Sequence, residues 1–327
     1  MVYHAHSNYY SGEVANSCAG CPWFCWLPIR HAEEGILVME NVKKRGFVMF
    51  DKMRILPLDH FLLAMTNLAH FHGRWLVYKW MAEQGQLGGE AWSMDKFKSA
   101  LNTQKRAPKF VYNQLLNGTA KTVKRILELE GKEDLIPNVR HFFSVTARRQ
   151  LGRFMGNVST DIDTCCHGDF WSNNIMFKYD EEGKVNETIL VDFQLINYGH
   201  PAYDLMYLLY LSTDTQFRDQ HMDQCLQHYW DTLNQYITQF QPKGTKYEWQ
   251  DFQTDIQTYK TIGFVMATTL LPNVLSTTQV EPGGILALKE MQRKQAAELE
   301  DADNVASKEI KRRIVGLTEE LVRDKVI

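Results

Sequence analysis

The stretch CCHGDFWSNNIMFKYDEEGKVNETILVDFQ, residues 165–194, decides the fold expected for this chain. Two short apolar segments within it, 174–179 and 188–192, stand on either side of the turn-forming cluster Asp180-Glu-Glu-Gly-Lys. Apolar segments of this length, separated by a polar turn that contains glycine, predict a β-hairpin. The hairpin returns the chain on itself, so we expect Asp192, at the end of the second strand, to lie beside the loop that precedes the first strand.

Four polar side chains of this stretch have the order and spacing that phosphoryl transfer requires. His167, Asp169 and Asn174 form the pattern H-x-D-x-x-x-x-N, and Asp192 follows eighteen residues after Asn174. A carboxylate such as Asp169 can receive or orient the proton of an attacking hydroxyl, while Asn174 and Asp192 can hold Mg²⁺ against nucleotide phosphates. Hard oxygen ligands suit this ion. Each residue alone is an ordinary polar loop position, but their order, their spacing and the hairpin between them favour a kinase-like site.

Outside this stretch, the sequence predicts a mostly helical α+β protein. The apolar run Ile36–Met39 is typical of a buried strand. Over residues 59–81, behind Pro57, apolar residues recur every three or four positions, which is typical of a helix. Further helical patterns cover residues 109–130, 139–157, 202–212, 216–240, 250–271 and 303–323.

Two of the helical segments carry a more specific expectation. The apolar run that starts at Gly263 ends at Pro272 and is too short to cross a bilayer, so we expect a core helix. The tail from Lys289 to Asp324 is charged and follows the helical period, which favours a solvated outer helix.

The composition argues against several classes of protein. The chain has 327 residues with 36 Lys and Arg against 39 Asp and Glu, and this near balance argues against a nucleic-acid-binding protein. The N-terminus lacks the basic start and apolar stretch of a secretory signal. Six cysteines are too few for a disulfide scaffold and indicate a reducing compartment. We expect a cytoplasmic monomer whose partner is a small molecule, and neither a membrane nor a nucleic acid.

The segments HGDFWSNNIMFKYDEEGK (167–184) and ILVDFQLINYGHPAYDLMYLLY (189–210) closely resemble the ecdysteroid kinase-like family, also called CHK kinase-like. Its members are related to choline kinases and aminoglycoside phosphotransferases and share the protein-kinase-like fold. The resemblance runs from about Ile36 to the C-terminus. It implies ATP as co-substrate, Mg²⁺ as cofactor and a hydroxyl group as phosphoryl acceptor.

The resemblance also assigns roles to individual residues. It implies that Asp169 is the catalytic base and that Asn174 and Asp192 bind magnesium. Asp204 resembles an aspartate that supports the catalytic loop through His167; the alternative is a charge that stabilises the start of a helix.

Other assignments from the resemblance concern the architecture. The segment ILVMENV (36–42) resembles the strand and hinge between two lobes, where the backbone at Met39, Glu40 and Asn41 would meet adenine. This divides the chain into residues 1–42, a remnant of the N-lobe with the hinge, and residues 43–327, the C-lobe. Residues 68–72 (LAHFH) match a helix beneath the loop, which makes His70 and His72 structural.

The N-terminal part of the chain departs from the family. A kinase of this fold needs a glycine-rich loop and a lysine at the phosphates, but Lys43 is the first lysine of the sequence, and Arg30 is the only earlier Arg or Lys. Residues 8–14 look like the end of the N-lobe helix, with His6 in place of its usual glutamate. The departure implies a truncated N-lobe, in the gene model or in the protein itself.

Some residues keep two interpretations. Cys18, Cys21 and Cys25 could begin a zinc site, but the next pair, Cys165 and Cys166, lies in the catalytic loop, so separate thiols are favoured. Phe170 and Trp171 could shape a substrate pocket or pack in the core.

The sequence therefore predicts an ATP-dependent kinase that phosphorylates a hydroxyl of a small metabolite, either a steroid-like or another alcohol. The alternative is a catalytically impaired, pseudokinase-like binding protein, because the lysine and the glycine-rich loop are missing. A protein kinase is disfavoured, because no A-P-E segment follows Asp192.

Overall fold

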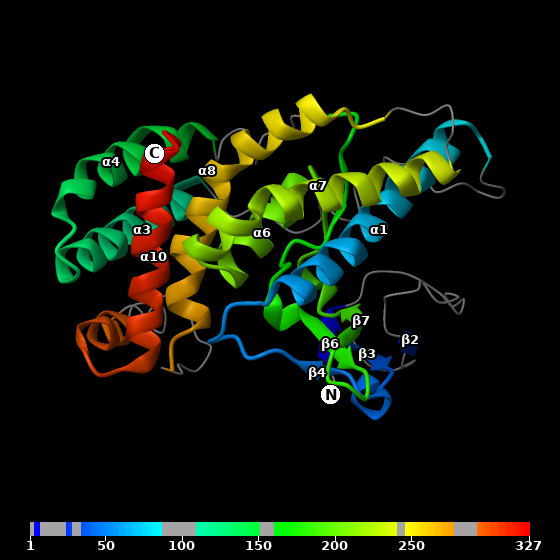
Figure 1. Ribbon diagram of the computed structural model, residues 1–327, viewed down its shortest axis with the longest axis horizontal. Coiled ribbons are helices and arrows are strands. Elements are labelled where there is room, and N and C mark those ends of the chain that lie inside the picture. The colour runs from blue at the N-terminus through cyan, green and yellow to red at the C-terminus, as the bar shows by residue number, and fades with distance from the viewer. Residues whose placement is uncertain are drawn as a thin grey trace.

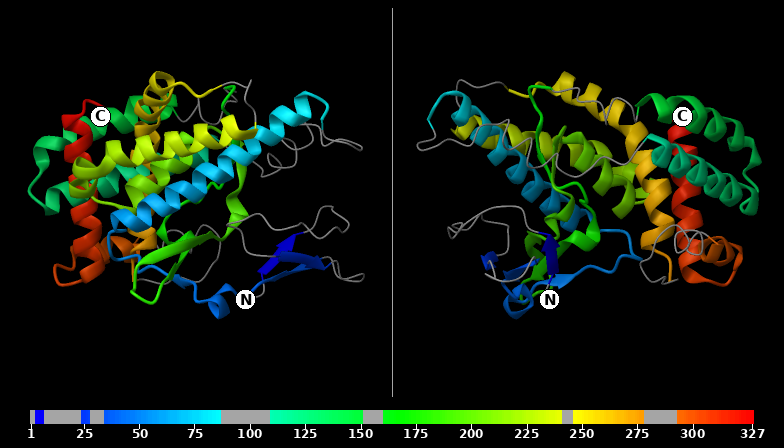
Figure 2. Two further views of the ribbon diagram at one scale, coloured as in Figure 1. Left: turned by 45° about the vertical axis from the view of Figure 1, so that its right-hand side comes forward. Right: turned by 180° about the vertical axis from the view of Figure 1, so that it is seen from behind.

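The computed structural model describes residues 3–6, 24–27, 34–86, 109–150, 160–240, 246–277 and 293–327. Within these ranges, small β-sheets are combined with long helices, which confirms the predicted α+β class (Figure 1). The two three-stranded sheets lie together at one end of the molecule, beneath helix α1 (Leu58–Glu83) (Figure 2). The helices form the larger part, and the C-terminus lies on the side away from the sheets.

The first sheet comes from the N-terminal region. Its middle strand, β3 (Glu34–Met39), pairs antiparallel with β1 (Tyr3–His6) on one side and with β2 (Phe24–Leu27) on the other. This confirms the predicted strand at 36–39. His6 lies in strand β1, so the helical position assigned to it by the family resemblance is wrong; residues 8–14 lie outside the described residues.

The predicted hairpin is confirmed, with shifted ends. It consists of β6 (Ile175–Tyr179) and β7 (Val185–Leu190), and the short strand β4 (Val48–Met49) pairs with β6 on the other side. In the turn, the Asp180 carboxylate accepts hydrogen bonds from two backbone N–H groups, and Gly183 has a φ of 78°. The second strand ends at Leu190, so Asp192 lies beyond it and not at its end.

Two long helices form one side of the helical body. α1 packs along α7 (Thr215–Phe240), and both views in Figure 2 show them side by side. The apolar side chains of Phe61, Met65 and Leu68 recur on one face of α1 and are fully buried, as the sequence period predicted. Pro57 precedes the first turn of α1, where proline is well tolerated.

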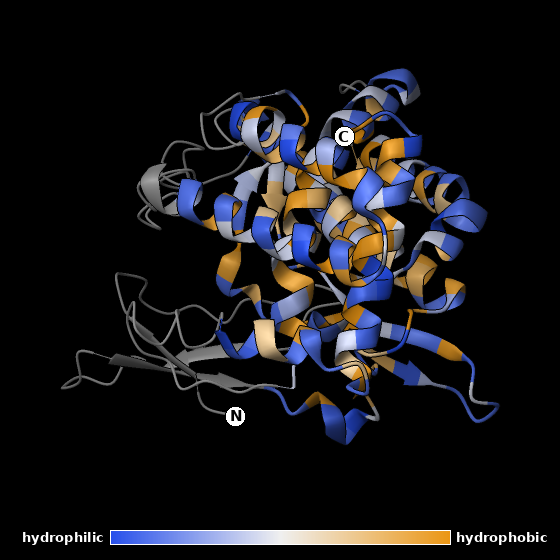
Figure 3. Cartoon of the chain, turned by 90° about the vertical axis from the view of Figure 1, so that its left-hand side faces the viewer, coloured by the Kyte–Doolittle hydropathy of each residue, from blue (hydrophilic) through white to orange (hydrophobic). Residues whose placement is uncertain are grey.

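Further helices share one large hydrophobic core with this pair. They are α3 (Lys109–Leu129), α4 (Ile136–His141), α6 (Ala202–Ser212), α8 (Trp249–Val274) and α10 (Val305–Arg323). Colouring by hydropathy shows apolar segments turned inward between the helices and polar segments turned outward (Figure 3). Among the described residues, no helix combines the length and the apolar character that crossing a membrane would need.

The helix predicted over 139–157 is interrupted. A π-helical turn (Phe142–Thr146) follows α4, and helical residues continue to 150, while 151–157 lie outside the described residues. In this turn Phe142 and Phe143 both contact Phe264 of α8, with ring centroids 5.2 and 5.9 Å apart.

Of two expectations about the C-terminal helices, one is confirmed and one is wrong. α8 is the expected core helix, with Phe264, Ala267 and Leu271 fully buried, and it continues past Pro272 to Val274. α10 is not a solvated outer helix. It buries Ile310, Ile314, Leu317 and Leu321 against the core.

Candidate active site

The loop that carries Asp169 is positioned by a two-stranded sheet. The buried strand β5 (Thr164–Cys166) pairs antiparallel with β8 (Asn197–Gly199). β5 leads into the loop at 167–174 and β8 leads, through two residues, into α6. The pairing therefore brings the loop and the start of α6 together, although they are separated by the hairpin in sequence.

Asp204, in the first turn of α6, holds the backbone of this loop. Its fully buried carboxylate accepts hydrogen bonds from the N–H groups of His167 at 2.7 Å and Gly168 at 3.0 Å, and it lies 3.1 Å from Nε2 of His72. The expected contact with His167 is present, but through the backbone amide and not through the ring. The carboxylate also lies at a helix N-terminus, where a negative charge is favourable, so the two interpretations of Asp204 are compatible.

Gly168 lets the loop pass close to the segment after β7. Its φ is 83°, a left-handed conformation that side chains rarely allow. A Cβ atom added here would lie 2.0 Å from the carbonyl oxygen of Leu195. Only glycine fits, for reasons of both conformation and space.

The His167 ring links the same two segments. Nε2 lies 3.0 Å from the carbonyl oxygen of Val191 and must donate to it, which leaves Nδ1 to accept from the Asp169 N–H at 3.4 Å. Burial lowers the pKa of His167 below its ordinary value, although the Asp204 carboxylate opposes this. The neutral tautomer with a proton on Nε2 satisfies both contacts. The ring also packs on Phe193, with centroids 4.7 Å apart.

Asp169, the predicted base, has both carboxylate oxygens engaged. Oδ1 accepts a hydrogen bond from the Tyr207 hydroxyl at 2.6 Å, and Oδ2 accepts one from Nδ2 of Asn174 at 2.8 Å. Nδ2 of Asn174 also donates to the Asp169 carbonyl oxygen at 2.8 Å. Asp169 and Asn174, predicted from spacing to act together, are thus in direct contact. Asp169 is partly exposed, as a group that receives a substrate proton must be.

Asp192 is brought to the same place by the backbone. Asn174 ends a short 3₁₀ turn (Ser172–Asn174), and its carbonyl oxygen accepts from the N–H of Val191 at 3.0 Å. Asp192 follows in a left-handed conformation, with φ 65° and ψ 66°. This conformation is uncommon outside glycine, and aspartate is among the residues that tolerate it. Its carboxylate accepts from Nε2 of Gln194 at 3.3 Å.

Helix α6 contacts the loop at three points along one face. Asp204 holds its start, Tyr207 holds the side chain of Asp169, and the Ser212 hydroxyl accepts from the N–H of Ser172 at 3.0 Å. Residues at positions 204, 207 and 212 lie on one side of a helix because its period is 3.6 residues. The whole loop is therefore laid along one buried helix.

The structure describes the backbone of the expected hinge, but the role of this segment in binding adenine stays a prediction. Met39 ends strand β3, and residues 40 and 41 lead into a 3₁₀ turn (Val42–Arg45). Glu40 accepts at its carbonyl from the N–H of Val42 and pairs at its carboxylate with Arg45 at 3.3 Å. Asn41 is exposed. The contacts described for Glu40 and Asn41 lie within this segment and do not reach the loop at 167–174.

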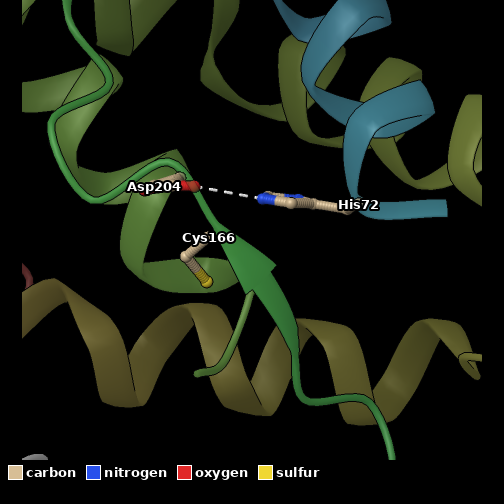
Figure 4. Close-up of side chains that lie close together, drawn as sticks. All are labelled: His72, Cys166 and Asp204. Carbon is tan, nitrogen blue, oxygen red and sulfur yellow. Dashed lines mark hydrogen bonds and ion pairs between the residues drawn. The ribbon is translucent and has the colours of Figure 1, made fainter. Parts of the chain in front are cut away.

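Three potential metal ligands meet in the core below the loop. Ligand atoms of His72, Cys166 and Asp204 lie within 4.8 Å of one another, from α1, β5 and α6 (Figure 4). Each has a protein partner: His72 also contacts the Tyr229 hydroxyl at 2.7 Å, and the Cys166 thiol lies 3.5 Å from the carbonyl oxygen of His200. Burial raises the pKa of the Cys166 thiol well above its usual range, which disfavours the thiolate that metals need. The cluster is a hydrogen-bonded part of the core.

The residues with two interpretations can now be placed. Phe170 and Trp171 are both buried in the core, at 0% and 8% exposure, so the packing interpretation of this pair is the one that the structure supports. Cys18 and Cys21 lie outside the described residues. His72 is fully buried beneath the loop, and its carbonyl oxygen accepts from Thr164, consistent with a structural role.

Sequence reasoning missed Tyr207. One signal was available: Tyr207 lies three residues after Asp204, so the two share a helix face, and Asp204 was already assigned to the loop. Nothing in the sequence, however, distinguishes Tyr207 from the neighbouring Tyr203 and Tyr210.

Comparison with known proteins adds a family assignment. A sequence model described as the ecdysteroid kinase-like family matches residues 17–241, which include the loop, the hairpin and α6. No curated protein matches the chain. Among solved structures, an ethanolamine kinase from Plasmodium vivax is similar, with a TM-score of 0.42 and 13% sequence identity; the similarity covers 94% of this chain and 69% of that one.

Proposed function

The chain belongs to the ecdysteroid kinase-like family and has its protein-kinase-like fold, and we propose that it transfers the γ-phosphoryl group of ATP to a hydroxyl of a small molecule. The observation that carries the proposal is the Asp169 carboxylate, held by Tyr207 and Asn174 on a loop whose backbone is fixed by Asp204. The acceptor that we propose is a steroid-like or another alcohol.

In the proposed reaction, Asp169 accepts the proton of the acceptor hydroxyl while the hydroxyl oxygen attacks the γ-phosphorus. The bond from the γ-phosphorus to the bridging oxygen breaks, and ADP leaves with that electron pair. Each oxygen of Asp169 already accepts one hydrogen bond and keeps a lone pair for the incoming hydroxyl. The proton is then released from Asp169 to solvent.

The residues near Asp169 fit a magnesium site. Asn174 turns its Nδ2 toward Asp169, which leaves the amide oxygen as its ligand atom, and Asp192 offers a partly exposed carboxylate. Two oxygen donors, one of them charged, are what Mg²⁺ typically takes from protein when phosphates supply the rest. When bound, the ion neutralises charge on the β- and γ-phosphates. Asn174 and Asp192 would hold it.

The remaining assignments are part of the same proposal. The backbone at Met39, Glu40 and Asn41 would bind the adenine edge of ATP. Residues 1–42 would then form the N-lobe part with the hinge, and residues 43–327 the C-lobe. The cytoplasmic location and the monomeric state stay predictions.

The alternative is a binding protein with impaired catalysis. It is suggested by the sequence, in which Lys43 is the first lysine and follows the proposed hinge. Such a protein would retain the acceptor site in the helical part and transfer no phosphoryl group.

The test is a transfer assay with radiolabelled ATP and Mg²⁺ on three acceptors: a hydroxysteroid, a long-chain alcohol and a short polar alcohol. Asp169→Asn is compared with Asp161→Asn, an exposed aspartate just before β5. We expect transfer by the wild type and by Asp161→Asn, and a reduction of about 10²–10⁴-fold in Asp169→Asn, which is typical for loss of a general base.

The outcomes separate the two candidates. Transfer that is unchanged in Asp169→Asn would contradict the role of Asp169. If no acceptor is phosphorylated while calorimetry shows that the wild-type chain binds one of them, the binding-protein alternative replaces the kinase.

A further inference from the structure

Tyr207 makes a direct contact with the proposed base that the reaction scheme above does not use. Its hydroxyl donates to Oδ1 of Asp169 at 2.6 Å, on the oxygen opposite the one bound by Asn174. The Tyr207 side chain is only 4% exposed, so solvent does not compete for this bond.

The donor is rigidly placed. Tyr207 lies in the buried helix α6, three residues after Asp204, and its ring packs beside Tyr203 with centroids 6.0 Å apart. Burial, together with the hydrogen bond to Asp169, raises the pKa of the Tyr207 hydroxyl above its ordinary value, so the group stays protonated and remains a donor at physiological pH. One helix thus fixes both the loop backbone, through Asp204, and the carboxylate on that loop.

A carboxylate held in this way has a defined orientation. Rotation about the last bond of an aspartate side chain is soft, with broad preferences. Two donors on opposite oxygens, Tyr207 and Asn174, stop that rotation and aim the remaining lone pairs in fixed directions. Alignment of the reacting groups is a large part of what enzymes contribute to rate.

We propose that Tyr207 is a positioning residue, whose hydroxyl holds the Asp169 carboxylate in the orientation that accepts the proton of the substrate. The inference rests on the proposed kinase function. It differs from a packing role, in which the ring alone would matter. The substitution Tyr207→Phe keeps the ring and removes only the hydroxyl, so it separates the two roles.

The chain offers a matched control on the same helix. Tyr210 is also a buried tyrosine of α6, but its hydroxyl has no hydrogen-bond partner among the described residues. Tyr210→Phe is therefore the same chemical change without the loss of a contact. Both variants are assayed with the acceptor that the wild type phosphorylates best, and their stability is measured by urea unfolding.

We expect Tyr207→Phe to lower kcat about tenfold, because the Asp169 carboxylate loses one of the two donors that align it with the substrate hydroxyl. KM for ATP should not change, and Tyr210→Phe should keep the wild-type kcat. The urea midpoint of Tyr207→Phe should lie below that of Tyr210→Phe, because only Tyr207 loses a hydrogen bond, but both variants should be fully folded under the assay conditions. In an Asp169→Asn background, Tyr207→Phe should cause no further loss, because the two residues act as one unit.

Three results would overturn the inference. One is a wild-type kcat in Tyr207→Phe. Another is an equal loss of kcat in Tyr207→Phe and Tyr210→Phe, which would indicate a packing role for the helix. The last is a full additional loss from Tyr207→Phe in the Asp169→Asn background. If the wild-type chain phosphorylates no acceptor, the proposed function is wrong. This inference then fails with it, before any variant is compared.

Discussion

The loop at 167–174 and the turn at 191–195 carry the two aspartates of the candidate site, but the two aspartates are held very differently. Asp169 in the loop is bound through both oxygens by Tyr207 and Asn174. Asp192 in the turn has a strained left-handed backbone, partial exposure and one described carboxylate contact, to Gln194 at 3.3 Å. The difference matches the proposed roles. A base must be aimed before the substrate arrives, whereas a metal ligand needs oxygen atoms left open for the ion.

Removal of the carboxylate that holds the loop backbone should have the largest effect on the free energy of unfolding. Asp204→Ala removes the acceptor for the N–H groups of His167 and Gly168 and a partner of His72 in the core. Each buried donor left unsatisfied costs about 1–3 kcal/mol, so we expect a loss of about 3–5 kcal/mol in the free energy of unfolding, measured with urea. Asp231→Ala, an exposed change on α7, is the control. An unchanged urea midpoint for Asp204→Ala would mean that the carboxylate does not support the loop. Its interaction with the N-terminus of α6 would then be its only role.

The contact between the loop and the turn can be tested at glycine. Gly168→Ala forces a left-handed alanine and places its Cβ 2.0 Å from the Leu195 carbonyl oxygen, a backbone atom that cannot move freely. Gly183→Ala has a similar φ of 78° but nothing within 4 Å. The left-handed conformation costs about 1–2 kcal/mol in both. We expect Gly168→Ala to lose at least about 1 kcal/mol more than Gly183→Ala in urea. Equal losses would mean that the turn adapts to the loop.

The local parts of this comparison could be predicted from the sequence. The hairpin follows from two short apolar segments on either side of the Asp180 turn, and the grouping of Asp169 with Asn174 follows from their spacing on one short loop. Both depend on residues that are close in the chain. The limits of the second strand were missed, because the left-handed conformation of Asp192 depends on the loop against which it lies.

The parts that depend on distant contacts could not be predicted. Tyr207 acquires its role from the pairing of β5 with β8, which no local pattern encodes. The charged tail was expected to be solvated because charges are usually exposed, but Glu320 of α10 is buried in a bidentate pair with Arg218 of α7. Arg313 is also buried and donates to the Leu211 carbonyl oxygen. Buried charges of this kind are satisfied only by tertiary partners.

Substitution of Asp192, whose carboxylate is partly exposed in the turn, should have an effect that depends on Mg²⁺. We expect Asp192→Ala to weaken the binding of ATP about tenfold in the presence of Mg²⁺ and hardly at all in its absence, because metal ligands and their supports typically contribute a factor of this size or more. Calorimetric titration with and without Mg²⁺ measures both. Glu181→Ala, an exposed carboxylate in the hairpin turn, controls for the loss of charge. The same weakening without Mg²⁺ would show that Asp192 is not a ligand.

The smallest effect is expected at the link between the two regions, the ring of His167. Burial lowers its pKa in the folded chain, so below the ordinary histidine value of about 6.5 the unfolded chain binds the proton more readily. Its contribution to stability is complete above that pH and is lost as the pH falls toward the lower, folded pKa, by less than about 1.4 kcal/mol per pH unit. We expect the urea midpoint to fall from pH 7.5 to 5.5, a window that leaves the carboxylates ionised. The fall should be smaller in His167→Gln. Burial also lowers the pKa of His70, so His70→Gln is measured alongside to separate the two contributions. A His167 ring that titrates above 6.5 by NMR would contradict the neutral tautomer, and with it the hydrogen bond that Nδ1 accepts from the Asp169 N–H.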